Sequence, residues 1–277
     1  MKITKMQGLG NDFILTEELP ADPAAAARRL CRRRLDIGAD GLVLVLPSQK
    51  ADLRMRIFNA DGSEAEMCGN AIRCVARYAK DRGLVEGPDM RVETLAGIMR
   101  PQFTEVNGEE WIRVDMGQPD LAPERIPARA EEPLHMEVPA DGGTLPASAL
   151  LMGVPHAVLF VDEIDEETIG RLGPRISSCD LFPRDINVNF VTRMGDDAFY
   201  VRTWERGAGR TLACGTGSCA AAVAAVMTGR SGRKVRIYVE AGWLDIEVTD
   251  DGVFMTGPAA YVFEGETEME TAAPDNI

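Results

Sequence analysis

Short apolar runs, several of them alternating with polar residues, recur along the whole chain and predict β-strands. In the first half, the predicted strands span residues 41–46, 53–58, 90–94 and 111–115. In the second half, they span residues 157–161, 188–191, 198–204, 234–239 and 244–248. A further segment near the C-terminus, residues 259–269, is expected to return and pair with the first half.

Each half also contains one strongly apolar helical segment, residues 71–80 and 218–227. The second segment is apolar on all sides, so we expect it to be buried all round. Asp22 and Pro23 favour a shorter helix over residues 24–30. Together these elements predict an α/β (α+β) fold with two pseudo-symmetric halves, each a curved mixed or antiparallel sheet wrapped around a central apolar helix.

The chain matches itself when it is shifted by about 145 residues, which indicates an internal repeat. Residues 6–11 lie over residues 151–156, and residues 67–70 lie over residues 213–216. Seven such anchors keep the same order, with shifts between 140 and 149 residues. Because chance similarity would not keep this order, we infer two homologous halves related by a pseudo-twofold axis, with a Cys-Gly segment at the same place in each.

A Pro-rich stretch over residues 118–146 separates the two halves and is typical of a linker with one or two edge strands. We therefore expect an N-terminal domain of residues 1–117, joined by the C-terminal strand within residues 259–277, and a second domain of residues 118–258. The last residues, 271–277, are expected to be disordered.

The composition narrows the range of functions. A hydrophobic fraction of 45% in 277 residues is enough for a core, and a net charge of −14 argues against nucleic acid or an anionic membrane as a partner. No stretch approaches the roughly 18 apolar residues of a membrane span, and the N-terminus lacks the pattern of a signal peptide. We therefore expect a cytoplasmic protein with reduced thiols. The six cysteines form no CxxC pair, so a metal site is not predicted.

Cys68 and Cys214 are the strongest candidates for chemistry, because each precedes a glycine and a predicted helix. We expect the positive end of a helix to lower the thiol pKa, and its N–H groups can bind a carboxylate. One thiolate and one thiol on opposite sides of an α-carbon would invert an amino acid without a cofactor. Taken singly, either cysteine could equally be a small buried hydrophobic residue.

The other polar candidates also allow structural interpretations. Asn11 and Asn59 lie in turn-like sequences and could simply cap those turns. Glu205 and Arg206 could form a surface ion pair, although their position after an apolar strand is compatible with a cleft. His156 is ambiguous alone, and its match to Asn11 across the repeat favours a role in a site.

Three groups of residues are similar to the motifs of the diaminopimelate epimerase family. They are Lys5-Met6-Gln7-Gly8-Leu9-Gly10-Asn11-Asp12-Phe13, Phe58-Asn59-Ala60-Asp61-Gly62-Ser63-Glu64 with Cys68-Gly69-Asn70, and Glu205-Arg206-Gly207-Ala208-Gly209 with Ala213-Cys214-Gly215-Thr216-Gly217. The resemblance covers nearly the whole chain. That family interconverts LL- and meso-diaminopimelate in lysine and peptidoglycan-precursor synthesis, without a cofactor and typically as a homodimer.

The resemblance implies a role for each candidate residue. Cys68 and Cys214 would form the acid/base pair. The residues whose backbone would bind the reacting carboxylate are Gly69, Asn70, Gly215 and Thr216. The residues close to the reacting amino group would be Glu205 and His156. The residues that contact the rest of the substrate would be Asn11, Asn59, Asn187 and Arg206.

Several positions depart from the commonest pattern of the family, namely Gln7, Gly41, Val154, Arg210 and Phe263. Gly41 and Val154 stand where members carry a substrate-binding Gln and Asn. A lost polar contact of this kind costs on the order of 1–3 kcal/mol when its partner is left unpaired. These departures from the family pattern therefore leave two alternatives open. The protein could be a racemase of another amino acid on the same scaffold, or a non-catalytic amino-acid-binding protein.

Overall fold

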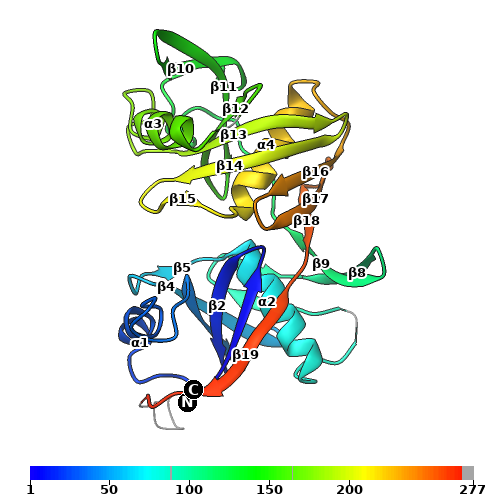
Figure 1. The fold of residues 1–277 in the computed structure, drawn as a ribbon. Coiled ribbons are helices and arrows are strands. Elements are labelled where there is room, and N and C mark those ends of the chain that lie inside the picture. The colour runs from blue at the N-terminus through cyan, green and yellow to red at the C-terminus, as the bar shows by residue number, and fades with distance from the viewer. Residues whose placement is uncertain (88, 164, 270–277) are drawn as a thin grey trace. The chain divides into compact units, whose positions relative to one another are not determined.

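The computed structural model describes residues 1–87, 89–163 and 165–269, so the tail that we expect to be disordered lies outside the described residues. The chain divides into two compact units (Figure 1). Unit 1 comprises Met1–Val114 and the described part of Gly257–Ile277, and unit 2 comprises Asp115–Thr256. The expected division into homologous domains, residues 1–117 with 259–277 and residues 118–258, stays a prediction.

Unit 1 is built on a mixed sheet with the strand order β19-β1-β2-β3-β4-β6-β7, in which β5 pairs only with β4. The strands are β1 (Lys2–Gly8), β2 (Asn11–Thr16), β3 (Gly41–Leu46), β4 (Leu53–Asn59), β5 (Glu64–Ala65), β6 (Val92–Thr94), β7 (Gly97–Met99) and β19 (Ala260–Glu266). The pairs β2–β3 and β4–β6 are parallel, and the other neighbours are antiparallel. The C-terminal strand β19 therefore pairs with β1, as the sequence predicts.

Unit 2 follows the same plan, with the strand order β10-β11-β12-β13-β14-β16-β17-β18 and with β15 paired to β14. The strands are β10 (Met136–Ala140), β11 (Gly143–Met152), β12 (Val154–Phe160), β13 (Asn187–Gly195), β14 (Ala198–Glu205), β15 (Gly209–Thr211), β16 (Lys234–Val239), β17 (Gly242–Val248) and β18 (Val253–Gly257). The pairs β12–β13 and β14–β16 are parallel, like their counterparts in unit 1. The Pro-rich stretch thus supplies an edge strand, β10, and the start of β11.

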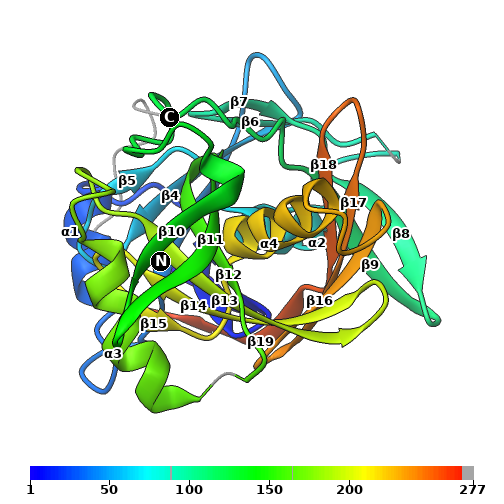
Figure 2. The same cartoon turned by 90° about the horizontal axis from the view of Figure 1, so that it is seen from above.

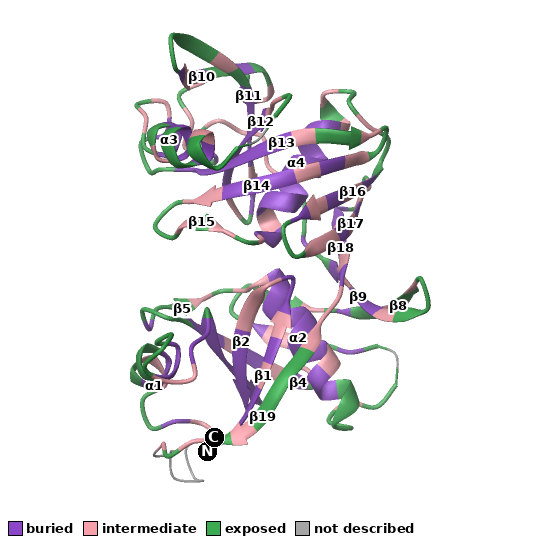
Figure 3. Ribbon diagram, in the orientation of Figure 1, coloured by how far each residue is buried: buried purple, intermediate pink, exposed green. Residues whose placement is uncertain are grey.

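Each unit has one central helix and one peripheral helix. The helices are α1 (Pro23–Leu30), α2 (Gly69–Asp81), α3 (Glu166–Ser177) and α4 (Gly215–Met227), with a short 3-10 turn, η1 (Pro133–His135). In unit 1, α2 packs against β1, β2 and β4, and in unit 2 the sheet curves around α4 (Figure 2). Residues 217–225 of α4 are all buried, as its apolar surface predicts (Figure 3). Within the described ranges, no helix is both long and apolar enough to cross a membrane.

A hairpin of β8 (Gln102–Val106) and β9 (Glu109–Asp115) follows the sheet of unit 1. It lies beside the C-terminal turn of α2. The ammonium group of Lys80 is 4.4 Å from the centre of the Phe103 ring and forms an ion pair with Glu110. These contacts attach the hairpin to the central helix of unit 1.

The strand register supports the repeat. In unit 1, Ile57 lies opposite Ala65, and in unit 2 Thr203 lies opposite Thr211. Both residues of the second pair are 146 positions after those of the first, which is also the separation between Cys68 and Cys214. The predicted fold of two pseudo-symmetric α+β halves is thereby confirmed.

The strand register changes one match between the two halves, that of His156 with Asn11. Gly41 and Asn187 take equivalent places in β3 and β13, and they lie opposite Phe13 and His156 respectively. His156 is therefore level with Phe13, whereas the ungapped alignment matches it to Asn11. The turn between β11 and β12 is one residue shorter than the turn between β1 and β2, which accounts for one of the two residues of this displacement.

Candidate active site

Cys68 forms the N-cap of α2 in unit 1. Its backbone is extended, with φ −139° and ψ 123°, and its carbonyl accepts a hydrogen bond from the Ile72 N–H at 2.9 Å. The first N–H groups of an α-helix have no partner within the helix. Those of Gly69 and Asn70 are therefore suited to bind a carboxylate beside the thiol.

Asn11 contacts both the thiol and the first turn of α2. Its side-chain oxygen lies 3.8 Å from the Cys68 sulfur. The same oxygen accepts a hydrogen bond from the side-chain Nδ2 of Asn70 at 3.0 Å. Its Nδ2 donates to the Asp40 carboxylate at 2.6 Å, and Arg33 pairs with the same carboxylate at 2.9 Å. Because a carboxylate only accepts hydrogen bonds, Asp40 fixes which end of the Asn11 amide faces Cys68.

Arg73, which the sequence analysis did not select, is fully buried behind the same turn. Its guanidinium donates to the carbonyl of Gly69 at 3.1 Å, to the side-chain oxygen of Asn70 at 2.9 Å and to the carbonyl of Pro258 at 3.1 Å. A Cβ at Gly8 would lie 3.0 Å from this guanidinium. Arg73 thus connects the first turn of α2 to the segment that leads into β19. The sequence carries no distinct signal for Arg73, because the same helical segment also contains Arg77 and Lys80.

Cys214 forms the equivalent N-cap of α4 in unit 2, with φ −123° and ψ 111°. Its carbonyl accepts a hydrogen bond from the Ser218 N–H at 2.9 Å, and its sulfur lies 3.4 Å from the Thr216 hydroxyl. Gly217 has no room for a Cβ, which would collide with the side-chain oxygen of Asn189. The glycine therefore lets the first turn of α4 lie directly against β13.

The surroundings of Cys214 raise the pKa of its thiol well above the usual value. Burial is the largest cause, the Glu205 carboxylate raises this pKa further, and hydrogen bonds with Thr216 and Gly217 oppose both. Glu205 itself accepts a hydrogen bond from the Thr211 hydroxyl at 2.6 Å. The expectation that the helix end lowers the pKa is therefore wrong for Cys214, since burial and a neighbouring carboxylate outweigh it. This side chain is a neutral thiol at pH 7.

His156 is fully buried in β12, next to the same part of β13. Its Nδ1 lies 3.1 Å from the Nδ2 of Asn189. Burial lowers the pKa of His156 to about 3, and the positive charge of Arg206 acts in the same direction. The ring is therefore neutral throughout the physiological pH range.

The residues expected at the far end of the substrate lie at strand ends. In unit 2, the side-chain oxygen of Asn187 accepts a hydrogen bond from the Arg206 N–H at 2.9 Å. The exposed guanidinium of Arg206 donates to the carbonyl of Arg184 at 3.0 Å. In unit 1, Asn59 closes a turn, and its Nδ2 donates to the Ser63 hydroxyl at 2.9 Å.

The predicted site residues therefore gather around two equivalent helix ends. In unit 1 the residues brought together around α2 are Asn11, Cys68, Gly69 and Asn70. In unit 2 those around α4 and the adjoining strand ends are His156, Asn187, Glu205, Arg206, Cys214, Gly215 and Thr216. Asn59 lies apart from the contacts of the unit 1 cluster. Among the described residues, no group of three or more His, Cys, Asp or Glu is arranged to hold a metal ion.

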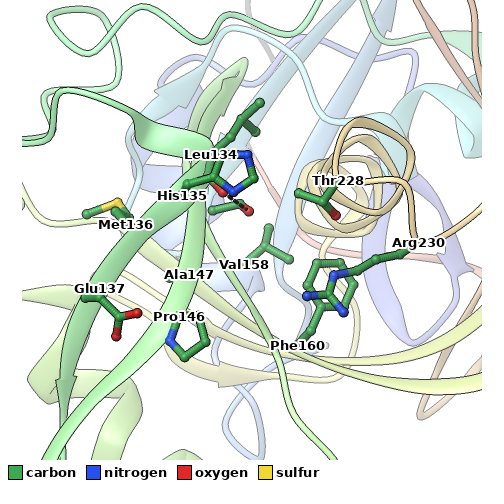
Figure 4. Close-up of a pocket in the computed structure, with 11 residues that line it drawn as sticks. Leu134, His135, Met136, Glu137, Pro146, Ala147, Val158, Phe160, Thr228 and Arg230 are labelled. Carbon is green, nitrogen blue, oxygen red and sulfur yellow. Dashed lines mark hydrogen bonds between the residues drawn. The ribbon is translucent and has the colours of Figure 1, made fainter.

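A pocket in unit 2 with a volume of about 330 Å³ lies away from the predicted site residues (Figure 4). It lies at the C-terminal end of α4, where Thr228 and Arg230 face η1 and β11. The Arg230 guanidinium stacks over the Phe160 ring at 4.4 Å. None of the predicted site residues lines this pocket, so the two helix ends remain the candidate site.

Comparison with known proteins assigns the chain to a family. It matches the family model described as diaminopimelate epimerase over residues 3–122 and 148–262. The chain belongs to the diaminopimelate epimerase family. The diaminopimelate epimerase of Moorella thermoacetica is 50% identical, over 98% of this chain and 100% of the relative. That of Desulforudis audaxviator is also 50% identical, over 96% of this chain and 99% of the relative. The protein is accordingly an isomerase.

Solved structures outside the epimerase family share the fold. A phenazine biosynthesis protein of the PhzF family from Bacillus anthracis has a TM-score of 0.72 at 19% identity, over 97% of this chain and 99% of that chain. A probable proline racemase from Agrobacterium radiobacter, solved with bound carbonate, also has a TM-score of 0.72 at 17% identity, over 99% and 94% of the two chains. At these identities the likeness concerns the fold alone.

Proposed function

We propose that the protein interconverts LL- and meso-diaminopimelate, in the synthesis of lysine and peptidoglycan precursors, by acid/base chemistry between Cys68 and Cys214. The observation that carries this proposal is the matched position of the two thiols. Each is the N-cap of the central helix in its unit, and the two helices occupy equivalent places in the strand order. No cofactor enters the proposed reaction.

The proposed reaction moves one proton on each side of the α-carbon. Cys214 is a thiol in the resting protein because burial and Glu205 raise its pKa, so it is suited to donate a proton. Cys68, as thiolate, removes the α-proton from the opposite face and becomes a thiol. The new proton comes from Cys214, which is left as the thiolate and can start the reverse reaction. The N–H groups of the two helix ends stabilise the negative charge that develops on the carboxylate.

The remaining site residues are proposed to bind the substrate. The backbone groups for the reacting carboxylate are those of Gly69, Asn70, Gly215 and Thr216. The groups near the reacting amino group are Glu205 and His156. The contacts to the rest of the molecule come from Asn11, Asn59, Asn187 and Arg206. The exposed guanidinium of Arg206 supports a substrate with a second carboxylate.

Hydrogen exchange at the α-carbon tests this proposal. The protein is incubated with LL-diaminopimelate in deuterium oxide, and the α-proton signal is followed by NMR. We expect the signal to disappear as meso-diaminopimelate forms, and replacing either Cys68 or Cys214 with Ala should abolish incorporation of deuterium into the product. Turnover that survives either substitution would reject the two-thiol mechanism.

Two other outcomes identify the alternatives. Exchange with a different amino acid, but not with diaminopimelate, would indicate a racemase whose pocket is altered through Val154. Binding of diaminopimelate without any exchange would indicate a non-catalytic amino-acid-binding protein. We also propose a homodimer and a cytoplasmic location, where thiols stay reduced.

A further inference from the structure

Asn189 lies between three polar groups in the core of unit 2 and is fully buried. Its side-chain oxygen accepts a hydrogen bond from the Thr203 hydroxyl at 3.0 Å. Its Nδ2 lies 3.0 Å from the carbonyl of Ala157 and 3.1 Å from the Nδ1 of His156. These contacts involve both ends of the amide at once.

The contacts settle which end of the amide is which. A backbone carbonyl can only accept a hydrogen bond, so the end of Asn189 that faces Ala157 must be the NH2 group. The same NH2 group faces the Nδ1 of His156 with its second hydrogen. The Nδ1 therefore carries a lone pair, and because the ring is neutral its one proton lies on Nε2.

The Nε2–H of His156 is a buried donor that has no hydrogen-bond acceptor within the described part of the chain. An unpaired buried donor of this kind destabilises the folded protein, so a ligand group that accepts from it is bound favourably. Because the Nδ1 faces Asn189, the Nε2 points to the opposite side of the ring. His156 lies opposite Asn187 in the register of β12 and β13, and Asn187 is one of the residues proposed to bind the substrate.

We propose that Thr203 and Asn189 are positioning residues that hold His156 as the neutral Nε2–H tautomer, and that this N–H donates to a carboxylate oxygen of the bound amino acid. The inference rests on the proposed function and makes it more specific. The resemblance to the family implies a place for His156 beside the substrate amino group. An ammonium group is itself only a donor, so an Nε2–H cannot accept from it and selects the carboxylate.

The imidazole nitrogens report this state directly by NMR. The chain has only two histidines, so a protein labelled with 15N-histidine gives two ring systems, and His135 serves as an internal reference. In the ligand-free protein, we expect the His156 Nε2 to be protonated and the Nδ1 to be bare. Saturation with an equilibrated mixture of LL- and meso-diaminopimelate should shift the Nε2–H signal while the proton stays on Nε2. A proton found on Nδ1 in either state, or an Nε2–H signal that the substrate does not move, would overturn the proposal.

Substitutions separate positioning from general structure. In Asn189→Asp, the new carboxylate accepts from the ring, so the Nδ1 of His156 should gain a proton. Asn107→Asp makes the same chemical change in an exposed turn and should leave both ring systems unchanged. His156→Met should lower kcat/KM at least ten-fold, and His156→Gln, which keeps a donor near the Nε2 position, should restore most of it.

The outcomes for the proposed function and for this inference are distinct. If diaminopimelate exchanges its α-proton but His156 carries its proton on Nδ1, the inference fails and the proposed function stands. If the ligand-free tautomer is as expected but no exchange occurs, the proposed function fails. An unchanged Nδ1 in Asn189→Asp, with circular dichroism like that of the wild type, would remove the positioning role of Asn189.

Discussion

Asp40 lies one contact away from Cys68 and acts on it through Asn11. Its carboxylate accepts from the Nδ2 of Asn11, which leaves the side-chain oxygen of Asn11 facing the sulfur at 3.8 Å. The side-chain oxygen of Asn11 can accept the S–H that Cys68 carries once it has taken the α-proton. In Asp40→Asn this fixed polarity is lost, because an amide can present either a donor or an acceptor. We expect kcat to fall about ten-fold, equivalent to ~1.4 kcal/mol, with a much smaller change in the free energy of unfolding.

This prediction is measured by the rate of α-proton exchange and by the pH dependence of Cys68 alkylation with iodoacetamide. Asp36→Asn is the control, because Asp36 pairs with Arg29 on the same stretch of chain and has no contact with Asn11 among those described. If both variants behave alike, the orientation of Asn11 by Asp40 does not matter for the reaction.

Glu205 offers a second test at the residue scale, through the pKa of Cys214. Burial is the main cause that raises the pKa of Cys214 above the ordinary value of 9.0, and the negative charge of Glu205 raises it further because it disfavours the thiolate. Glu205→Gln removes this charge, so the pKa of Cys214 falls. At any pH between about 8 and the wild-type pKa of Cys214, a larger fraction of this side chain is then thiolate. Alkylation of Cys214, measured by mass spectrometry in a Cys68→Ala background, should therefore become faster at pH 8–9. The exposed Glu167→Gln serves as the control, and identical pH profiles for the two variants would contradict the role of Glu205.

At the scale of elements, the position of α4 depends on a single missing side chain. A Cβ at Gly217 would collide with Asn189, so Gly217→Ala must push the first turn of α4 away from β13. We expect a loss of about 1–3 kcal/mol in the free energy of unfolding, as for other overpacked cores, together with a loss of exchange activity because Cys214 moves with the turn.

A matched glycine in the same unit should respond in the opposite direction. Gly170 lies within α3, and a Cβ there would meet no atom within 4 Å. Gly170→Ala should therefore raise the free energy of unfolding by roughly 0.5–1 kcal/mol, because alanine favours the helix, and should leave exchange unchanged. Urea denaturation measures both variants. Equal effects of the two substitutions would show that crowding at α4 does not decide its position.

The elements that the sequence predicted are those with an unbroken apolar pattern. The strands β3 and β16 have the predicted bounds, and α2 and α4 begin only two or three residues before theirs. The sequence does not predict α3, because its twelve residues include few large apolar side chains and contain two glycines and Pro174, which disfavour a helix. The Pro-rich stretch is expected to hold one or two edge strands, and it contains β10 and the start of β11, but its prolines leave their bounds unpredicted.

The residues of the candidate site likewise include some that the sequence predicts and some that it does not. The repeat and the motifs were sufficient to select Cys68 and Cys214, because helix ends are local features of the sequence. The sequence does not predict the partners Arg73, Asp40 and Asn189, since their roles depend on contacts between segments far apart in the chain. The direction of the Cys214 pKa was wrong for the same reason, because burial is a tertiary property.

At the scale of the whole molecule, the edge of the unit 1 sheet bears on the proposed homodimer. Strand β19 pairs with β1 on one side and is the terminal strand of that sheet (Figure 3). Three consecutive apolar residues on it are exposed: Tyr261, Val262 and Phe263. A long apolar edge strand attracts further strands, so proteins usually cover such an edge or place charges on it. A second copy of the chain would cover this edge, so the exposed apolar residues of β19 support the proposed homodimer.

Placing charges on this edge tests whether it forms the interface. The double variant Val262→Lys and Phe263→Lys should be a monomer by sedimentation at micromolar concentration, while the wild type should sediment as a dimer, because buried unpaired lysines oppose association. Leu35→Lys is the matched control, since Leu35 is 76% exposed and lies outside β19. A wild type that sediments as a monomer would reject the homodimer. A double variant that stays dimeric would show that the interface does not include β19, since two lysines on a terminal strand cannot be buried there without a partner charge.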